Sequence, residues 1–179
     1  MKTLKLFSAL IGCAVIAGCN LENMNQDNAE KSRFPDDGKP HYVVTVHEYV
    51  KYPGAKQLEK DIPTFSGRNI CVNVNNFIHS RYIEDIETIP MPNKPGFYHL
   101  KMKLNSRGIK MWINIAVRFK HQGMVFVIDG MAYRMFNPGM VDESTGWVVV
   151  EGPFDSFTAD ALKHFGKKNY EIYNPSSWF

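Results

Sequence analysis

The stretch that decides the fold runs from residue 97 to residue 136 and reads FYHLKMKLNSRGIKMWINIAVRFKHQGMVFVIDGMAYRMF. Apolar and polar side chains alternate over residues 97–105, which is typical of a strand with one buried and one solvated face. From Ile109 onward the period becomes that of an amphipathic helix, which we expect Ser106 to cap and Gly123 to end. The apolar stripe of this helix comprises Ile109, Trp112, Ile113, Ala116 and Val117.

The second half of this stretch predicts a tight hairpin. Residues 124–128 and 131–136 are rich in apolar side chains and flank Asp129-Gly130, a pair that suits a two-residue turn. Further along the chain, residues 147–151 (WVVVE) are typical of another strand.

A last helix follows that strand. Ser156 or Thr158 is expected to cap it, and Gly166 is expected to end it. The residues expected to point inward are Phe157, Ala161, Leu162 and Phe165.

The segments before residue 97 add further strands. Residues 42–50 and 69–75 are rich in β-branched and apolar side chains and predict strands, whereas residues 51–68 predict a loop with one helical turn. Residues 77–89 fit either a helix or a strand. Hairpins mixed with two helices predict an α+β fold, with a mainly antiparallel sheet and two helices packed on one face.

Residues 97–166 also carry a more specific pattern. A strand enters a helix through Asn105-Ser106-Arg107-Gly108, a hairpin follows at residues 125–130, and Val150-Glu151-Gly152-Pro153-Phe154 precedes a helix rich in Ala and Leu. This order resembles the first periplasmic head subdomain of the SecD/SecDF subunits of the bacterial protein-export translocon, with a weaker extension back to about residue 41. The resemblance implies a head-like module that contacts extended or unfolded polypeptide outside the membrane. The membrane spans of SecD and their charged residues have no counterpart in this sequence.

Residues 1–18 are typical of a bacterial lipoprotein signal. Lys2 and Lys5 give a positive start, and the apolar run after them is shorter than the roughly 20 residues that a membrane-spanning helix needs. Ile16-Ala17-Gly18-Cys19 resembles a lipobox, so we expect Cys19 to become the lipidated first residue of the mature protein. Asn20 rather than Asp follows it, which favours the outer over the inner membrane, with the protein facing the periplasm.

The sequence after the signal predicts a tether and one domain. Residues 19–40 are polar and lack apolar periodicity, which predicts a flexible tether ahead of a domain at 41–179. Loss of Lys2 and Lys5 with the signal lowers the formal charge from +3 to about +1. A near-neutral mature chain argues against a nucleic-acid partner, because such proteins carry a clear basic patch.

We find no sequence motif for a catalytic nucleophile, a phosphate loop or a cysteine metal site. His41 and His47, joined by Glu48, Glu84 or Asp85, are the candidate metal ligands. We interpret Asp129 as a turn residue and Asp142-Glu143 as a solvated surface pair. Cys71 is the one thiol left outside the signal and the lipidation site, and we expect it to be packed in the core.

The aromatic residues divide into two sets. Tyr133, Phe136 and Trp147 are expected in the core, whereas the C-terminal aromatics are candidates for a binding surface. The C-terminal set comprises Tyr170, Tyr173, Trp178 and Phe179.

These features predict a lipid-anchored periplasmic binding or adaptor module, without enzymatic activity, cofactor or metal, that acts by contact with an exported or envelope protein. Its binding surface is expected at the hairpin, on the helix faces, or at a sheet edge that pairs with an added strand. The alternatives are a periplasmic hydrolase or metal-binding protein that uses the histidines and acidic residues, and a purely structural envelope lipoprotein.

Overall fold

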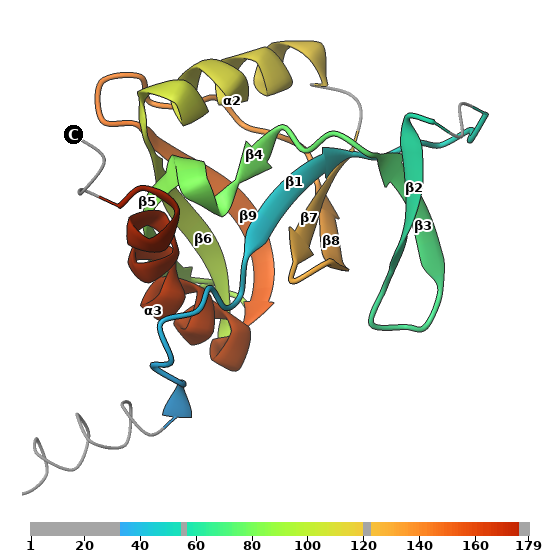
Figure 1. Cartoon of the computed structure of the whole chain (residues 1–179). Helices are drawn as coiled ribbons and strands as arrows, with labels where there is room; N and C mark the ends of the chain where they lie inside the picture. Colours follow the sequence, from blue (N-terminus) through green and yellow to red (C-terminus); the bar gives the residue numbers. More distant parts are fainter. Residues whose placement is uncertain (1–32, 55–56, 120–122, 176–179) are drawn as a thin grey trace, which may run out of the picture. The chain divides into compact units, whose positions relative to one another are not determined.

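The computed structural model describes residues 33–54, 57–119 and 123–175. The chain divides into two compact units, Met1–Asp37 and Gly38–Phe179, and the strands and helices labelled in Figure 1 all belong to the second. The predicted signal peptide, Cys19 and most of the predicted tether lie outside the described residues.

The strands form three antiparallel sheets. The first has the order β4-β1-β7-β8, with bounds Ile78–His79, Val44–Glu48, Met124–Ile128 and Met131–Phe136. The second has the order β5-β6-β9, with bounds Ile83–Pro90, Phe97–Leu104 and Trp147–Asp155. Strands β2 (Glu59–Pro63) and β3 (Asn69–Asn73) form a separate two-stranded ribbon. With helices α2 (Ser106–Arg118) and α3 (Ser156–Tyr173) and the 3-10 turn η1 (Ser80–Tyr82), they confirm the α+β class and its antiparallel pairing.

The main core combines apolar side chains from both larger sheets and from both helices. Phe126 of β7 and Phe154 of β9 meet edge to face with their ring centroids 5.3 Å apart. Trp112 of α2 and Leu162 of α3 reach the same core, and neither is exposed to solvent. Helix α3 packs along β5, whereas α2 lies across the upper end in Figure 1, where it contacts β4 and β6.

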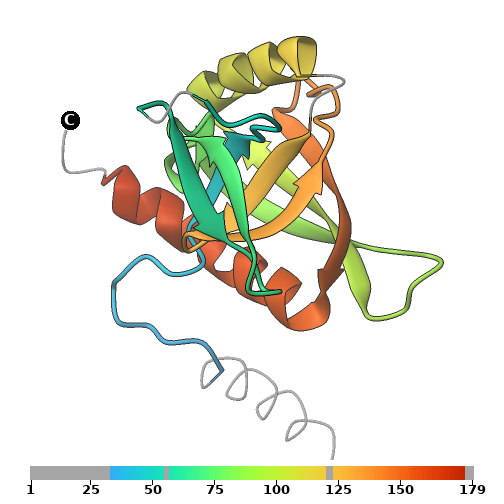
Figure 2. The same cartoon turned by 90° about the vertical axis from the view of Figure 1, so that its right-hand side faces the viewer.

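Strand β7 is buried on both of its faces. Met124, Phe126 and Ile128 point into the main core, while Val125 and Val127 point into a second, smaller core. Ile62 and Val72 of the β2–β3 ribbon complete that second core, so the ribbon covers the outer face of the first sheet. Figure 2 views the molecule from the side of this ribbon.

The expected hairpin between β7 and β8 is confirmed. Asp129 has φ +47° and Gly130 has φ +80°, the combination that a two-residue turn of the primed type needs. Asp129 also accepts hydrogen bonds from the backbone N–H groups of Tyr42 (3.0 Å) and Val43 (2.7 Å). The turn residue therefore also holds the chain that enters β1.

The predicted loop at residues 51–68 is wrong, because it contains strand β2, whose Ile62 packs into the second core. Residues 77–89, which fit either a helix or a strand, form β4, η1 and part of β5, since pairing with β1 and β6 overrides their helical spacing. The strand expected at 147–151 is confirmed but continues to Asp155.

The helix ends also differ from expectation. Asn105 caps α2 by accepting from the N–H of Gly108, and Asp155 caps α3 by accepting from the N–H of Thr158; both lie just before the predicted caps. Helix α3 continues past Gly166 to Tyr173. A Cβ on Gly166 would lie 2.9 Å from Ile86 Cγ1, so this glycine allows close packing against β5 and does not end the helix. Helix α2 ends at Arg118, with Phe119 as its C-cap residue, so the predicted end at Gly123 is wrong.

Two residues of the predicted apolar faces point outward. Val117 of α2 is 68% exposed, and Ile115 is buried in its place. Phe157 of α3 is also exposed, although it lies near the ring of Tyr42.

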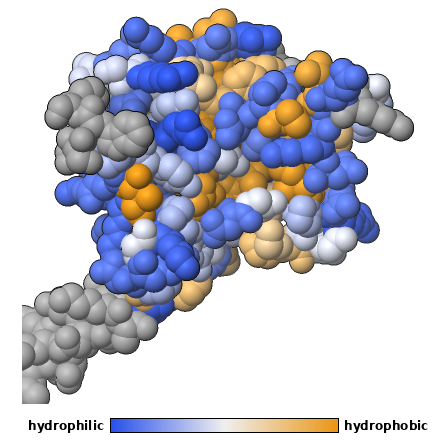
Figure 3. Space-filling view, viewed as in Figure 1, coloured by the Kyte–Doolittle hydropathy of each residue, from blue (hydrophilic) through white to orange (hydrophobic). Residues whose placement is uncertain are grey.

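On the face seen in Figure 1, hydrophilic surface covers most of the margins and apolar surface gathers toward the middle (Figure 3). Within the described residues, no helix is both long and apolar enough to cross a membrane.

Candidate functional site

Strand β9 points alternate side chains to opposite faces of its sheet. Val148 and Val150 are buried in the main core, whereas Trp147, Val149 and Glu151 share the outer face. Val149 is 43% exposed. The outer face of β9 therefore carries two apolar side chains and one acidic side chain in a row.

The direction of the β9 backbone groups follows from two hydrogen bonds. The carbonyl of Gly146 points toward β6 and accepts from the N–H of Leu104 (2.9 Å). The carbonyl of the next residue, Trp147, points away from β6 and accepts from the N–H of Asp142 (3.0 Å). Successive residues of an antiparallel strand point their backbone groups to opposite sides, so odd-numbered residues from Trp147 onward face the open edge.

The open edge extends over Val149 and Glu151. The outward N–H and C=O groups of these two residues have no hydrogen-bond partner within the described part of the chain. The loop at Asp142 occupies the edge before them, and Arg134 donates to the carbonyl of Pro153 (3.3 Å) after them. Four backbone groups in a short window are thus left available for another chain.

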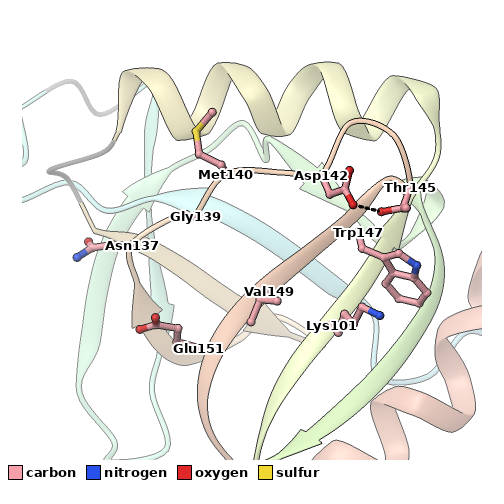
Figure 4. A pocket seen from close by; sticks show the side chains of 9 residues that line it. All are labelled: Lys101, Asn137, Gly139, Met140, Asp142, Thr145, Trp147, Val149 and Glu151. Atoms are coloured by element: carbon pink, nitrogen blue, oxygen red, sulfur yellow. Dashed lines mark hydrogen bonds between the residues drawn. The ribbon is translucent and has the colours of Figure 1, made fainter.

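A cavity of about 620 Å³ lies against this edge (Figure 4). Its floor is the outer face of the sheet, formed by Lys101 of β6 and by Trp147, Val149 and Glu151 of β9. Its wall is the loop between β8 and β9, which contributes Asn137, Gly139, Met140, Asp142 and Thr145. We call this cavity, together with the open edge, the β9 groove.

The wall of the groove is fixed by specific bonds. Trp112 is buried in α2 and donates from Nε1 to the carbonyl of Gly139 (2.8 Å). Asp142 accepts from the hydroxyls of Ser144 (2.6 Å) and Thr145 (2.7 Å) and from the N–H of Ser144 (3.0 Å). These hydrogen bonds, led by that of the Ser144 side chain, lower the pKa of Asp142. The predicted solvated pair Asp142-Glu143 therefore includes a turn residue that shapes the groove.

Charges on the floor are largely paired. Lys101 Nζ lies 3.2 Å from Glu87 Oε2 and 4.3 Å from the centre of the Trp147 ring. Beside this pair, Lys103 Nζ lies 3.4 Å from Glu84 Oε2. Glu151 makes no such ion pair with any described residue, although its charge acts on Arg134. The groove therefore has an acidic end at Glu151 and a neutralised end at Lys101.

The structure does not bring the candidate metal ligands together. His41 contacts the ring of Phe165 on α3, whereas His47 bonds to Asn73 and Thr45. Glu84 pairs with Lys103, Asp85 accepts from the N–H of Ile86, and Glu48 accepts from Asn73. Across residues 33–54, 57–119 and 123–175, no three His, Cys, Asp or Glu side chains form a group suited to a metal ion.

His47 instead links β1 to the ribbon. Only 2% of it is exposed, its Nδ1 lies 2.9 Å from the carbonyl oxygen of Asn73, and its Nε2 lies 3.1 Å from Thr45 Oγ1. Burial lowers the pKa of His47, and the charge of Lys60 acts in the same direction, against the opposing effect of the Asn73 carbonyl. Burial between the first sheet and β3 therefore favours the neutral form of His47.

We expect the free energy of unfolding to fall as the pH drops through about 6.5, the ordinary pKa of histidine. The unfolded chain takes up a proton at His47 at a higher pH than the folded chain does, so protonation favours unfolding. His79, whose pKa is lowered by burial and by Arg81, contributes in the same direction. Urea unfolding at about pH 7.5 and about pH 5.5 measures the effect. A His47→Gln variant should show a smaller loss over this range, and an unchanged loss would contradict the assignment to His47.

The prediction of a core position has different outcomes for Cys71, Phe136 and Tyr133. Cys71 is not in the core: its side chain is partly exposed, and partial burial, Glu59 and Asp61 raise the pKa of its thiol. Phe136 is buried as expected, and Tyr133 stacks on Phe154 and donates to Asp155 (2.6 Å).

The remaining aromatics lie at two surfaces. The core assignment is wrong for Trp147, which is partly exposed on the floor of the β9 groove. Tyr170 and Tyr173 are partly buried on α3, where Tyr173 lies 4.8 Å from the ring of His79, and Trp178 and Phe179 fall outside the described residues.

The fold is similar to that of SecDF periplasmic domains. One solved structure, SecDF in a super-membrane-facing form, is 12% identical with a TM-score of 0.50, over 71% of this chain and 19% of the SecDF chain. A second, from work on SecDF as a membrane component that enhances protein export, is 11% identical with a TM-score of 0.51, over 86% of this chain and 71% of the other. At these identities the likeness establishes the fold, and it confirms the SecD-like fold expected from residues 97–166. No protein-family model and no curated protein matches the sequence.

The β9 groove was not located by the sequence pattern. Residues 147–150 are all apolar, so the pattern does not separate the inward side chains from the outward ones. The acidic Glu151 and the loop at Asn137-Pro138-Gly139 are the only local signals of an exposed face and a nearby wall. The open edge itself depends on which strands pair, and the sequence leaves that undetermined.

Proposed function

We propose that this protein is a lipid-anchored module of the bacterial cell envelope that acts by contact with exported or envelope proteins. Its fold is that of periplasmic domains of SecDF, which is described as a component that enhances protein export. The observation that carries the proposal is the open edge of β9 beside a cavity of about 620 Å³. Unpaired backbone groups on a sheet edge bind extended polypeptide by adding a strand, which needs no catalytic group.

The anchor in this proposal is lipid on Cys19. The supporting observation is the sequence Ile16-Ala17-Gly18-Cys19 after a short apolar run. More than one acyl chain is needed for stable membrane attachment, and a lipidated N-terminal cysteine supplies them. The polar residues after it would let the domain reach neighbouring proteins on the periplasmic side, with the outer membrane as the proposed site.

Mass spectrometry of the mature N-terminus tests the anchor. The expected result is a lipid-modified Cys19 as the first residue, and an unprocessed precursor without lipid when Cys19→Ser is made. An unmodified first residue other than Cys19 would overturn the lipoprotein proposal and leave the contact function to be tested separately.

Site-specific crosslinking in cells tests the contact function. A photoreactive residue in place of Met140, which is 72% exposed at the groove, should capture envelope or exported proteins. The same replacement at Val117, which is exposed on α2 outside the groove, is the matched control. Alanine replacement of the histidines and acidic residues outside the groove should leave complementation of a deletion phenotype intact in every variant that still folds. One such replacement that abolishes function in a folded, abundant protein would favour an enzyme or metal protein instead.

A further inference from the structure

We infer that the β9 groove binds an extended polypeptide segment as an added strand opposite Val149–Glu151. The preferred segment has an apolar residue and a Lys or Arg two positions before or after it. This inference rests on the proposed contact function and specifies the partner that the groove recognises. It follows from the register of the edge, the side chains on the floor and the poor fit of a second copy of this chain.

The register of the added strand is confined to a short window. The outward N–H and C=O groups of Val149 and Glu151 are available, whereas the carbonyl of Trp147 is already bonded to Asp142. The carbonyl of Pro153 is bonded to Arg134, and proline has no N–H to donate. A segment of about three residues, roughly 10 Å in extended form, therefore fills the edge.

The side chains of the floor define the preference. Val149 and Glu151 stand two residues apart on one face, so the partner residues opposite them also stand two apart and share that face. Val149, together with Trp147 and Met140 beside it, offers an apolar contact.

The acidic end of the groove favours a basic partner residue. Glu151 is exposed and forms no ion pair among the described residues, so a Lys or Arg opposite it is favoured. The nearby Arg134 donates to the carbonyl of Pro153 and acts on Glu151 only from beyond ion-pair distance, and Lys101 is paired with Glu87.

A second copy of the chain fits this edge poorly. If two copies paired their β9 strands antiparallel with Val150 opposite Val150, Val149 of each copy would lie opposite Glu151 of the other, an apolar residue against a carboxylate. Pairing about Glu151 would set two carboxylates opposite each other, which destabilises a strand pair. Pairing about Val149 would require the backbone of Trp147, which the loop at Asp142 already occupies. The observations therefore favour a different polypeptide with a basic residue.

Fluorescence anisotropy with labelled synthetic peptides tests the preference. The probe is a peptide of about nine residues with Val-Thr-Lys at its centre in a Ser/Thr background, added to the full mature chain in detergent. A peptide with Glu in place of Lys should bind more weakly, by roughly threefold, as expected for an exposed charge pair. Methylation of the backbone nitrogens of the central residues should reduce binding by about tenfold or more, because it removes the donors to the edge.

Variants of the protein locate the binding. Glu151→Lys should reverse the preference between the Lys and Glu peptides, and Glu171→Lys, the same charge change on the exposed side of α3, should leave it unchanged. Val149→Pro should reduce binding by about tenfold or more, since it removes an outward N–H at an edge position where proline is tolerated. If that variant does not fold, the Glu151→Lys comparison still decides the outcome.

Hydrogen exchange separates strand addition from other modes of binding. The amide protons of Val149 and Glu151 should become protected when the Lys peptide is bound. Binding without that protection, an unchanged charge preference in Glu151→Lys, or no binding of any of these peptides would each overturn this inference. Crosslinking from Met140 in cells tests the contact function on its own, so a captured partner together with a negative peptide result would reject only the strand-addition mode.

Discussion

Replacement of Gly152 by alanine is expected to lower the free energy of unfolding by about 3 kcal/mol, near the upper end for overpacking. A Cβ at this position would fall on the carbonyl oxygen of Tyr98, and it would also lie 2.9 Å from the Tyr98 carbonyl carbon and 3.1 Å from Met91 Sδ. A backbone oxygen cannot swing aside as a flexible side chain can, so β6 and β9 must separate here. The bulge between Tyr98 and Leu100 lies at this point of the β6–β9 register.

Urea or thermal unfolding of the Gly152→Ala variant measures this loss. Gly54→Ala is the matched control, because a Cβ on Gly54 would meet nothing within 4 Å. A Gly152→Ala protein as stable as the Gly54→Ala control would show that the two strands do not approach as closely as described.

Replacement of Trp112 by alanine is expected to cost about 4 kcal/mol, as for other fully buried large aromatic residues. The Trp112 side chain is not exposed, it stacks near Phe136 with ring centroids 6.1 Å apart, and its removal leaves a cavity beneath α2. It also leaves the Gly139 carbonyl without its donor. Both effects act on the wall of the β9 groove.

Trp112→Phe separates packing from hydrogen bonding. It keeps most of the aromatic volume but removes the Nε1–H, so a smaller loss of about 1–2 kcal/mol is expected. Val117→Ala on the exposed side of the same helix is the control and should change stability little. Chemical denaturation gives all three values, and an Ala variant no less stable than the Phe variant would contradict a packing role for Trp112.

The central part of the fold was accessible from the sequence because its patterns are local. Alternation over residues 97–105 located β6, and Asp129-Gly130 located the turn between β7 and β8. Strand β2 was missed because one buried residue, Ile62, stands among charged and proline neighbours. Its pairing depends on a core supplied by β7, which lies more than fifty residues away in the sequence.

The candidate site was less accessible, because an edge is a property of the whole sheet. The outward Trp147 was expected in the core, since tryptophan in an apolar run is usually buried. Trp147 is exposed because its side chain lies on the face of β9 opposite to Val148 and Val150. Only the pairing of β9 with β6 determines which of these two faces is buried. The histidines do not converge, because His41 lies before β1 and contacts Phe165 of α3, whereas His47 lies within β1 and bonds to Asn73 of β3.

The burial of β7 on both faces has a consequence for solubility. Its sequence MVFVI carries no charge, no proline and no glycine, which is the composition of segments that aggregate when they become exposed. The β2–β3 ribbon covers Val125 and Val127, and the outer side of the ribbon is itself mostly polar. The ribbon thus shields an aggregation-prone strand, and a shortened chain without it would need polar residues at positions 125 and 127 to remain soluble.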